Sequence, residues 1–415
     1  MKDSTNFDIR ISESNFADIM GVSKRTLQLW EKNGKYIPQT DAKGQKYYSL
    51  DTLQEVPEIR QMIETTWDEE FKTMPNRSYT SIELFAGAGG LALGMEKAGF
   101  KHIMLNEFDR FACDTLRMNR PDWNVIQDDI HQVDFSAYAG KVDVLSGGFP
   151  CQAFSYAGNK GGFEDTRGTL FFEMARAIKS IQPKIVFCEN VKGLLSHDNG
   201  QTLSVIKNTI KELGYTLVDP RVLQAIKFQV PQKRERLILI AIRNDLASKA
   251  TFKWPAPYRR IMTLRDALYA GELYETDVPS SDGQKYPEKK RKVMDLVPMG
   301  GYWRDLPIEV QKAYMGRSFE LEGGKTGMAR RLSLDEPSLT LTCAPAQKQT
   351  ERCHPLETRP LTVREYARIQ TFPDDWNFAG NITSQYKQIG NAVPVNLAFA
   401  VGRALVRLLN DLEQK

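Results

Sequence analysis

The sequence predicts an α/β protein built on a doubly wound sheet, preceded by a small helical module and interrupted by an irregular segment. Three observations support this prediction. From Tyr79 onward, strands, glycine turns and helices alternate, as in sheets that carry helices on both faces. Residues 1–72 show helix-turn-helix spacing, and the alternation fades between about residues 259 and 355. The 415 residues also exceed what one hydrophobic core usually supports, so several folding units are expected.

The N-terminal module begins with two predicted helices. Apolar residues between Ser14 and Met20 have helical spacing, and Gly21 is placed to end that helix. Ser23 is suited to cap a second helix, which carries Leu27 and Trp30. Two short helices joined by such a turn predict a helix-turn-helix unit.

Short β-prone pieces follow these helices, and the turn around Lys43 lies between them like the wing of a winged DNA-binding domain. The stretch Gly21–Leu27, with Trp30–Glu31, resembles the MerR-type winged helix. We therefore expect residues 1–72 to bind DNA, with Lys24 and Arg25 among the contacts. A helical hairpin that serves only protein contacts is the alternative.

The next elements belong to the sheet and its interruption. The polar segment 64–77 has the composition of a linker, and we place the linker itself at residues 73–78. Five strands are expected after it: Ser81–Phe85, His102–Asn106, Val142–Leu145, Ile185–Cys188 and Leu237–Ile242. The irregular segment 259–355 contains a basic run from Lys285 to Lys292 and looks inserted. Periodic sequence resumes near Thr362, and an amphipathic helix is expected from Val395 to Leu409.

Composition narrows the function classes. No apolar run approaches the roughly 20 residues of a membrane span, and the polar start is unlike a signal peptide, so we expect a cytoplasmic protein. The chain has five cysteines, Cys113, Cys151, Cys188, Cys343 and Cys353. They show no CxxC spacing, which argues against a disulfide framework and against a zinc site. We expect no bound metal. A net charge of +4 leaves room for local basic faces on a nearly neutral body.

One cysteine has an unusual setting. The apolar run Val142–Leu145 ends at Gly147–Gly148, which lets the backbone turn sharply, and Pro150 restricts φ directly before Cys151. A thiol held in this way at the end of a buried strand is a candidate nucleophile in a cleft. An inert core cysteine is the alternative for any isolated cysteine.

The first glycine-rich turn has the features of a nucleoside site. Glu107 follows Gly87 by twenty residues, where an acidic group at the end of the second strand can bind a ribose diol. Asp129 and Ile130, at a third strand end, are placed to hold an adenine. The turn lacks the full dinucleotide spacing, so S-adenosylmethionine fits better than NAD.

Five segments, taken together, resemble the ordered motifs of the DNA (cytosine-5)-methyltransferase family. They are Phe85–Leu91 (FAGAGGL), Gly148–Gln152 (GFPCQ), Glu189–Val191 (ENV), Gln232–Arg236 (QKRER) and Gly390–Pro394 (GNAVP). The similarity to the HhaI-type bacterial enzymes is nearly continuous from Phe85 to Arg243. It covers residues 79–258 and again 356 to the end, and it does not reach the N-terminal module.

The resemblance implies a Rossmann-like, S-adenosylmethionine-dependent methyltransferase domain at 79–258 that resumes at 356–415. Residues 259–355 would then be an inserted target-recognition domain. The cofactor would be held by the residues of the glycine turn, the strand ends and the late motif: Phe85, Gly87, Gly89, Gly90, Leu91, Glu107, Asp129, Ile130, Pro150, Asn391 and Val393.

The chemistry of cytosine agrees with this resemblance. Because C5 is a weak nucleophile, an enzyme must first add a nucleophile at C6, and the Cys151 thiolate suits that addition. Negative charge moving toward N3 needs an acid, which we expect to be Glu189, at the end of an apolar strand. Arg234 and Arg236 are expected to bind the cytosine carbonyl and a nearby phosphate. Gln232 is expected to support them and to contact DNA.

The target base would have to flip out of a DNA duplex to reach this chemistry. The segment Ser155–Gly162 has the small, glycine-rich composition of a lid, and Gln152 and Ser155 are expected to contact DNA. Sequence recognition is expected from the inserted segment, with these candidates: Arg330, Arg331, Thr340, Thr342, Gln347, Lys348, Gln349 and Thr350. The segment Arg359–Glu365 resembles the family's helix that supports this domain.

We therefore expect a monomeric restriction-modification methyltransferase that acts on a short site in double-stranded DNA and protects it from a cognate endonuclease. Two alternatives stay open. A tRNA-modifying branch shares the fold, although its cysteine loop usually carries consecutive prolines, unlike Gly148–Cys151 here. The other is a transcription regulator with an inert methylase half. The N-terminal module could also act as an autoregulator in an active enzyme.

Overall fold

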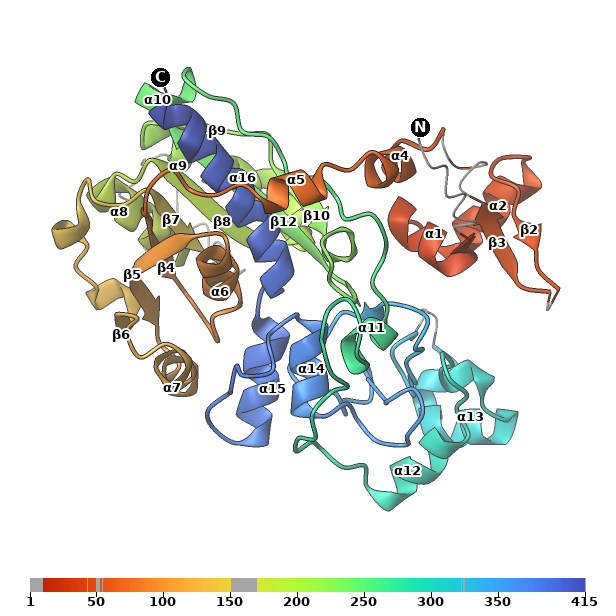
Figure 1. Cartoon of the computed structure of the whole chain (residues 1–415). Helices are drawn as coiled ribbons and strands as arrows, with labels where there is room; N and C mark the ends of the chain where they lie inside the picture. The colour runs from red at the N-terminus through yellow and green to blue at the C-terminus, as the bar shows by residue number, and fades with distance from the viewer. Residues whose placement is uncertain are drawn as a thin grey trace.

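The central sheet places the carboxyl ends of its parallel strands at one edge (Figure 1). The computed structural model describes residues 10–42, 44–49, 53, 55–150, 170–321, 323 and 325–414. Within them, the sheet has the order β10-β12-β8-β7-β4-β5-β6, with β9 also paired to β12. The strands are β4 (Tyr79–Leu84), β5 (Phe100–Glu107), β6 (Val125–Gln127), β7 (Val144–Gly147), β8 (Ile185–Val191), β9 (Tyr215–Leu217), β10 (Arg221–Gln224) and β12 (Glu235–Arg243). The predicted α/β class is confirmed.

Strand direction defines where a ligand can bind. β6, β5, β4, β7 and β8 run parallel, while β12 is antiparallel to β8, β9 and β10. The chain builds outward in one direction through β4, β5 and β6, and in the other through β7 and β8. The topological switch point therefore lies between β4 and β7, and a crevice is expected outside their carboxyl ends.

Each face of the sheet is covered by helices, as the two-residue alternation of its strands requires. Val144, Ile185 and Ile238 face α6 (Gly90–Lys97) and α16 (Val395–Glu413) in one buried cluster. Leu145, Val186 and Leu237, their chain neighbours, face α8 (Leu170–Ile181) and α9 (Gln201–Glu212) in another. Helices α7 (Arg110–Asn119) and α10 (Asn244–Ala247) lie at the periphery (Figure 1).

One helical stretch, Ile382–Glu413, is long and apolar enough to span a membrane by composition alone. It comprises α15 (Ile382–Asn391) and α16, and 89% of its most apolar window is buried inside the protein. Its apolar character is therefore explained by its place in the core.

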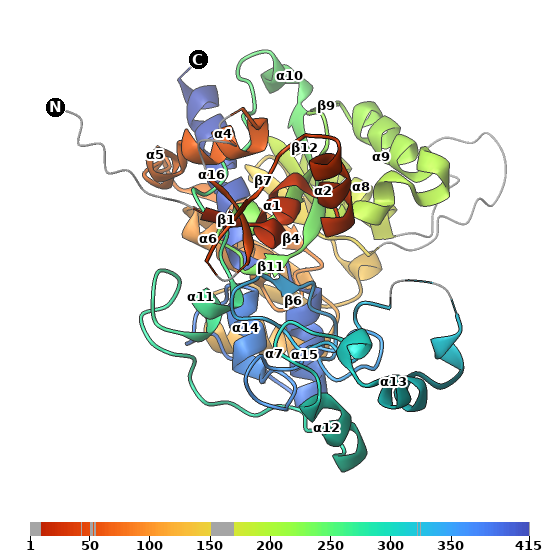
Figure 2. The ribbon, with the colours of Figure 1, turned by 90° about the vertical axis from the view of Figure 1, so that its right-hand side faces the viewer.

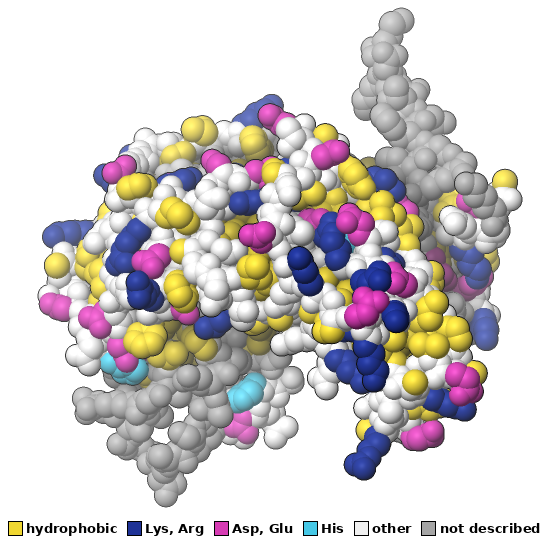
Figure 3. Space-filling view, turned by 90° about the horizontal axis from the view of Figure 1, so that it is seen from below, with side chains coloured by type: hydrophobic (Ala, Val, Ile, Leu, Met, Phe, Trp, Pro, Cys, Tyr) yellow, Lys and Arg dark blue, Asp and Glu magenta, His cyan; other side chains and the backbone are white. Residues whose placement is uncertain are grey.

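A small lobe, α11 to α15, lies below the sheet in Figure 1. Its further elements are α11 (Leu264–Leu268), α12 (Glu288–Asp295), α13 (Ile308–Met315), β13 (Ser338–Leu339) and α14 (Val363–Ile369). β13 pairs in parallel with β11 (Gln232–Lys233), which joins the lobe to the main body. Seen from below in Figure 3, Lys and Arg side chains gather over the lobe, interspersed with acidic ones. In the basic run, Lys289 and Lys292 of α12 are exposed.

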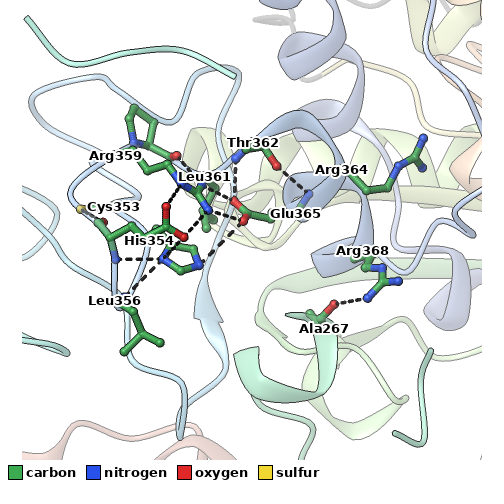
Figure 4. Close-up of polar contacts among 12 residues, drawn as sticks. Ala267, Cys353, His354, Leu356, Arg359, Leu361, Thr362, Arg364, Glu365 and Arg368 are labelled. Carbon is green, nitrogen blue, oxygen red and sulfur yellow. Dashed lines mark hydrogen bonds and ion pairs between the residues drawn. The ribbon is translucent and has the colours of Figure 1, made fainter. Parts of the chain in front are cut away.

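A buried polar network holds the start of α14 (Figure 4). Thr362 and Glu365 form a capping box, and both carboxylate oxygens of Glu365 accept from Arg359 at 2.8 Å. His354 accepts the N–H groups of Leu356 and Glu357 on Nδ1, so this histidine has a structural partner set rather than a free ligand position. The contacts explain how the expected supporting helix is fixed beside the inserted segment.

The N-terminal module, β1 to α4, stands beside β10 and β12 (Figure 2). Its elements are β1 (Arg10–Ser12), α1 (Glu13–Met20), α2 (Lys24–Lys32), β2 (Gln39–Thr40), β3 (Lys46–Ser49) and α4 (Pro57–Ile63). Gly21 ends α1 in the left-handed conformation, and the Ser23 hydroxyl caps α2, as the sequence predicted. The antiparallel sheet has the order β1-β3-β2, and its first strand was not foreseen.

The polar segment 64–77, whose composition indicated a linker, is packed rather than free. It contains α5 (Trp67–Phe71), and Trp67 is buried in the same cluster as the core of α16. Beyond it, Arg77 donates to both carboxylate oxygens of Asp143, at 2.6 and 2.9 Å. A buried aromatic anchor in a mostly polar stretch contributes to this packing, because an indole buries a large apolar area.

Candidate active site

A cavity of about 900 Å³ opens at the carboxyl ends of β4, β5, β7 and β8. This is the switch point that the strand order marks, and the volume lies within the range of ligand pockets, ~300–1,000 Å³. All five sequence motifs reach it through their own residues, and the motif that contains Cys151 does so through Gly148, Phe149 and Pro150. The order of the strands therefore brings together segments that are far apart in the chain.

The glycine turn after β4 forms one wall. Phe85 and Gly87 both have positive φ, 58° and 54°, so the chain turns abruptly before α6 begins. A Cβ on Gly90 would lie 2.2 Å from the carbonyl oxygen of Val393. Only glycine permits this approach, which closes the late motif over the start of α6.

Glu107 connects this wall to the next. One carboxylate oxygen accepts from the N–H of Gly87 at 2.8 Å, and the other accepts from the N–H groups of Phe108 and Asp109 at 2.9 and 2.7 Å. The carboxylate is thus held at the end of β5 by backbone donors. At the end of β6, the Asp129 carboxylate accepts from the N–H and ring of His131, at 3.1 and 2.6 Å.

Most residues predicted to hold a cofactor lie on the cavity wall. Those that line it are Phe85, Gly87, Gly90, Leu91, Glu107, Asp129, Ile130, Pro150, Asn391 and Val393. Gly89 is not among the lining residues. It caps α6 with φ 86°, and a Cβ there would lie 2.7 Å from Leu116. Its glycine is required by the packing of the turn.

Glu189 lies at the far side of the cavity, between an arginine and a glycine. Its Oε1 is 2.5 Å from Nε of Arg236, and a Cβ on Gly148 would lie 2.9 Å from its Oε2. Burial raises the pKa of the Glu189 carboxyl above its ordinary value, although Arg236 and Arg234 oppose the shift. A carboxyl group held in one position with a raised pKa is suited to donate a proton.

Arg234 is buried beside this pair and lines the cavity. One of its terminal nitrogens donates to the carbonyl oxygens of Gly390 and Ala392, both at 3.0 Å. Burial lowers the pKa of its guanidinium to about 9. Arg234 thus ties the late motif to the strand that carries Arg236.

The expected nucleophile lies outside the described residues. This nucleophile, Cys151, directly follows Pro150 in the chain. Gln152, Ser155 and the expected lid also lie outside the described residues. The residues before it are well anchored, because the Asn190 amide donates to the carbonyl of Phe149 at 2.9 Å. The Asn190 side chain thus holds the backbone just before Pro150.

Two residues expected to contact DNA are buried instead. Gln232 is fully buried and binds Gln370 and the N–H of Leu341, at 2.8 and 3.0 Å, so it braces β11 against the lobe. Arg331 is buried as well, and its donors are satisfied by five oxygens, those of Met294, Val297, His354, Glu357 and Thr358. Both expectations are corrected, because neither side chain has a free edge for a base.

The other expected DNA contacts are closer to the surface. Arg330 donates to the carbonyl of Gly300 and lies over the ring of Tyr302, while Lys348 is exposed and donates to the carbonyl of Tyr314. Lys24 is paired with Glu336 at 3.4 Å, and Arg25 is exposed. Thr340 and Thr342 line the cavity.

Two of the cavity-wall residues that sequence reasoning missed have side chains suited to hold a ligand. Glu83 lies in β4, is 1% exposed, and has one carboxylate oxygen without a partner among the described residues. Burial raises the pKa of Glu83 well above its ordinary value. Phe108 follows Glu107 and is 73% exposed. Both residues could have been found from the sequence. Glu83 is a lone acid inside an apolar strand, and Phe108 is an aromatic residue directly after Glu107, the acid expected to bind a ribose.

Comparison with known proteins gives consistent matches. The family model for C-5 cytosine-specific DNA methylase matches residues 79–407, and the model for the MerR HTH family regulatory protein matches residues 11–66. The chain is 62% identical over 405 residues to the Type II methyltransferase M.Eco47II of Escherichia coli, covering 97% of each chain. It is 60% identical to M.PspPI of a Psychrobacter strain, again over 97% of each.

A solved structure shows the same fold. A putative DNA modification methyltransferase encoded within an E. coli prophage superposes with a TM-score of 0.58 at 24% identity. The match covers 80% of this chain and 100% of that chain.

Proposed function

Because this chain belongs to the C-5 cytosine-specific DNA methylase family and is a Type II methyltransferase of the restriction-modification kind, we propose that it methylates C5 of a flipped-out cytosine through a covalent Cys151 adduct. The cytosine would lie within a short specific site in double-stranded DNA, and S-adenosylmethionine would be the methyl donor. One observation supports the proposal most strongly. A buried carboxyl group, that of Glu189, is held by Arg236 inside a cavity. The opposite wall of this cavity carries the residues expected to bind a nucleoside, including Gly87 and Glu107.

The cavity suits S-adenosylmethionine. Gly90 has no room for a side chain, the backbone-held Glu107 can accept from a ribose diol, and exposed Phe108 offers a face for an adenine. The unpartnered carboxylate oxygen of Glu83 is a suitable acceptor for the ammonium group of S-adenosylmethionine. When bound, this cofactor supplies an electrophilic methyl group.

The chain's own residues would prepare the base. The Cys151 thiolate forms a bond to C6, and the electron pair of the C5–C6 double bond moves toward C5 and the N3 side of the ring. Glu189 donates a proton at N3, which its raised pKa favours, and Arg236 holds the carboxyl in place. After methylation, a base takes the C5 proton, the electron pair left behind expels the Cys151 thiolate from C6, and the N3 proton returns to Glu189, so the ring is restored and both residues are regenerated.

The first test is bisulfite sequencing of plasmid DNA from cells that express the wild-type chain or a Cys151→Ser variant. We expect protected cytosines in one short motif with the wild type and none with the variant. Methylation that persists in Cys151→Ser would contradict the covalent mechanism. Methylated tRNA with unmodified plasmid would favour the RNA alternative, and no methylation of either would favour the regulator with an inert methylase half.

We propose the domain division 1–72, 79–258, 259–355 and 356–415 for the DNA-binding module, the catalytic domain, the target-recognition domain and the catalytic return. Arg330 and Lys348, near the surface of the small lobe, remain proposed DNA contacts there. A cognate endonuclease, a monomeric state and a cytoplasmic location complete the proposal.

A further inference from the structure

The N-terminal module is fixed to the main body through a shared core. Ile226 and Ile261, both outside the module, lie in the same buried cluster as Phe16, Leu27 and Tyr48 within it. A Cβ on Gly21, the residue that ends α1, would lie 2.9 Å from Nε2 of Gln224 in β10. The module is therefore docked and cannot swing as a tethered unit without exposing apolar surface.

A chain of ion pairs extends from the module to the cavity. Asp18 of α1 is 2.9 Å from Nζ of Lys233, Lys233 is 3.4 Å from Glu336, and Glu336 is 3.4 Å from Lys24, the first residue of α2. Lys233 directly precedes Arg234, which lines the cavity. The start of α2 is thus connected through two side chains to the strand that reaches the active site.

The free face of α2 is basic. Arg25, Gln28, Leu29 and Lys32 are all exposed and share one helix face by their spacing. Among the described residues, neither Arg25 nor Lys32 has an ion-pair partner, whereas Lys46 nearby is paired with Glu31 at 2.7 Å. In helix-turn-helix proteins the second helix is the one that enters the major groove.

The position of α2 makes this face useful to the enzyme itself. In Figure 2 the module faces the viewer, and α2 lies at its right-hand edge, the side toward which α13 of the small lobe projects. A duplex held between the main body and the lobe would pass this edge on one side of the target base only. The docked core keeps the relation between α2 and the cavity constant.

We propose that α2 binds the same DNA duplex whose cytosine enters the cavity, on one flank of the target site. The inference rests on the proposed function and deepens it. The module then acts as a one-sided clamp on flanking DNA, with Arg25 and Lys32 contacting phosphates. Binding to a separate promoter site, with no effect at the methylation site, is the competing outcome.

The test compares three duplexes that contain the mapped site. One covers the site alone, with about 12 base pairs, and the other two add about one helical turn, ~10 base pairs, on one side only. For the full-length chain, we expect one extended duplex to bind about tenfold more tightly than the short duplex, and the other to show little gain.

The Arg25→Ala/Lys32→Ala variant should bring the ratio of extended to short affinities close to one. For the favoured duplex, it should also make the plot of log binding constant against log salt concentration shallower, by the amount that corresponds to about two lost phosphate contacts. The matched control is Lys101→Ala/Lys249→Ala. It removes two exposed lysines at the end of the sheet that lies away from the cavity, and it should leave the ratio unchanged.

The proposal is overturned if neither extension improves binding, if both improve it equally, or if the gain survives in the Arg25→Ala/Lys32→Ala variant. Failure of the proposed function has a different signature. In that case the wild-type chain would not methylate even the short duplex, whatever the effect of flanking DNA.

Discussion

The carboxyl group of Glu189 has very little space, and replacing Gly148 by alanine should displace it. The new Cβ would lie 2.9 Å from Oε2, whereas ordinary contacts begin at 3.4 Å, so the carboxylate must move by about 0.5 Å. Arg236, 2.5 Å from Oε1 on the other side, resists that movement. The φ of Gly148 is not in the left-handed region, so alanine adds bulk without backbone strain.

A displacement of 1 Å in an active site can cost about 10²-fold in rate, so half that displacement predicts a loss of about tenfold in methyl transfer. The assay is a single-turnover measurement with labelled S-adenosylmethionine and a duplex that contains the mapped site. Gly193→Ala is the control, because a Cβ there meets nothing within 4 Å. The reasoning is refuted if Gly148→Ala transfers methyl at the wild-type rate, or if Gly193→Ala loses as much.

Three further changes test other parts of the structure. Glu189→Gln keeps the size of the side chain but cannot deliver a proton, so the rate of methyl transfer should fall by ~10²–10⁴-fold while equilibrium dialysis shows cofactor binding retained. Asp143→Asn should lower the free energy of unfolding by about 2 kcal/mol in urea titrations, because it breaks the ion pairs of a buried carboxylate. Burial by itself would raise the pKa of Asp143, but Arg77, the N–H of Thr80 and Lys184 hold that pKa below its ordinary value. That stability is present above the unfolded pKa of about 4 and is lost as the pH falls through the lower folded value, a loss that Asp143→Asn should abolish. Arg331→Ala should lower stability by about 3 kcal/mol or more, because it leaves several buried oxygens unpaired, whereas Lys348→Ala should leave the melting temperature unchanged and weaken DNA binding.

Local patterns were sufficient to predict much of the fold and the cavity. Strand ends followed by glycine or an acid placed Gly87, Glu107 and Asp129 on one edge, because parallel strands share their carboxyl ends. The antiparallel direction of β12 was not predictable from its sequence, since the apolar run Leu237–Ile242 reads the same in either direction. Direction depends on which neighbour the strand finds in the folded chain.

The errors at the site have a common physical origin. Gln232 and Arg331 were assigned to DNA by side-chain type, but each is buried with its polar atoms satisfied by segments more than twenty residues away. Glu83 was overlooked for the opposite reason, because it lies within a strand that otherwise reads as core. Residue type indicates which bonds a side chain can make, and tertiary packing decides whether water, protein or a ligand makes them.

The closure of the cavity by residues 390–394 has a consequence for when activity can begin. Gly90, near the start of the main domain, packs against Val393, and Arg234 donates to the carbonyls of Gly390 and Ala392 at 3.0 Å. The sheet strands and the glycine turn are synthesised long before these partners. Until residues 390–394 join them, Arg234 has no acceptors from the late motif and one wall of the cavity is missing. A restriction-modification methyltransferase built in this way closes its cavity only after residues 390–394 have been synthesised, so a product that stops before them but retains every strand of the sheet would still lack a closed cavity.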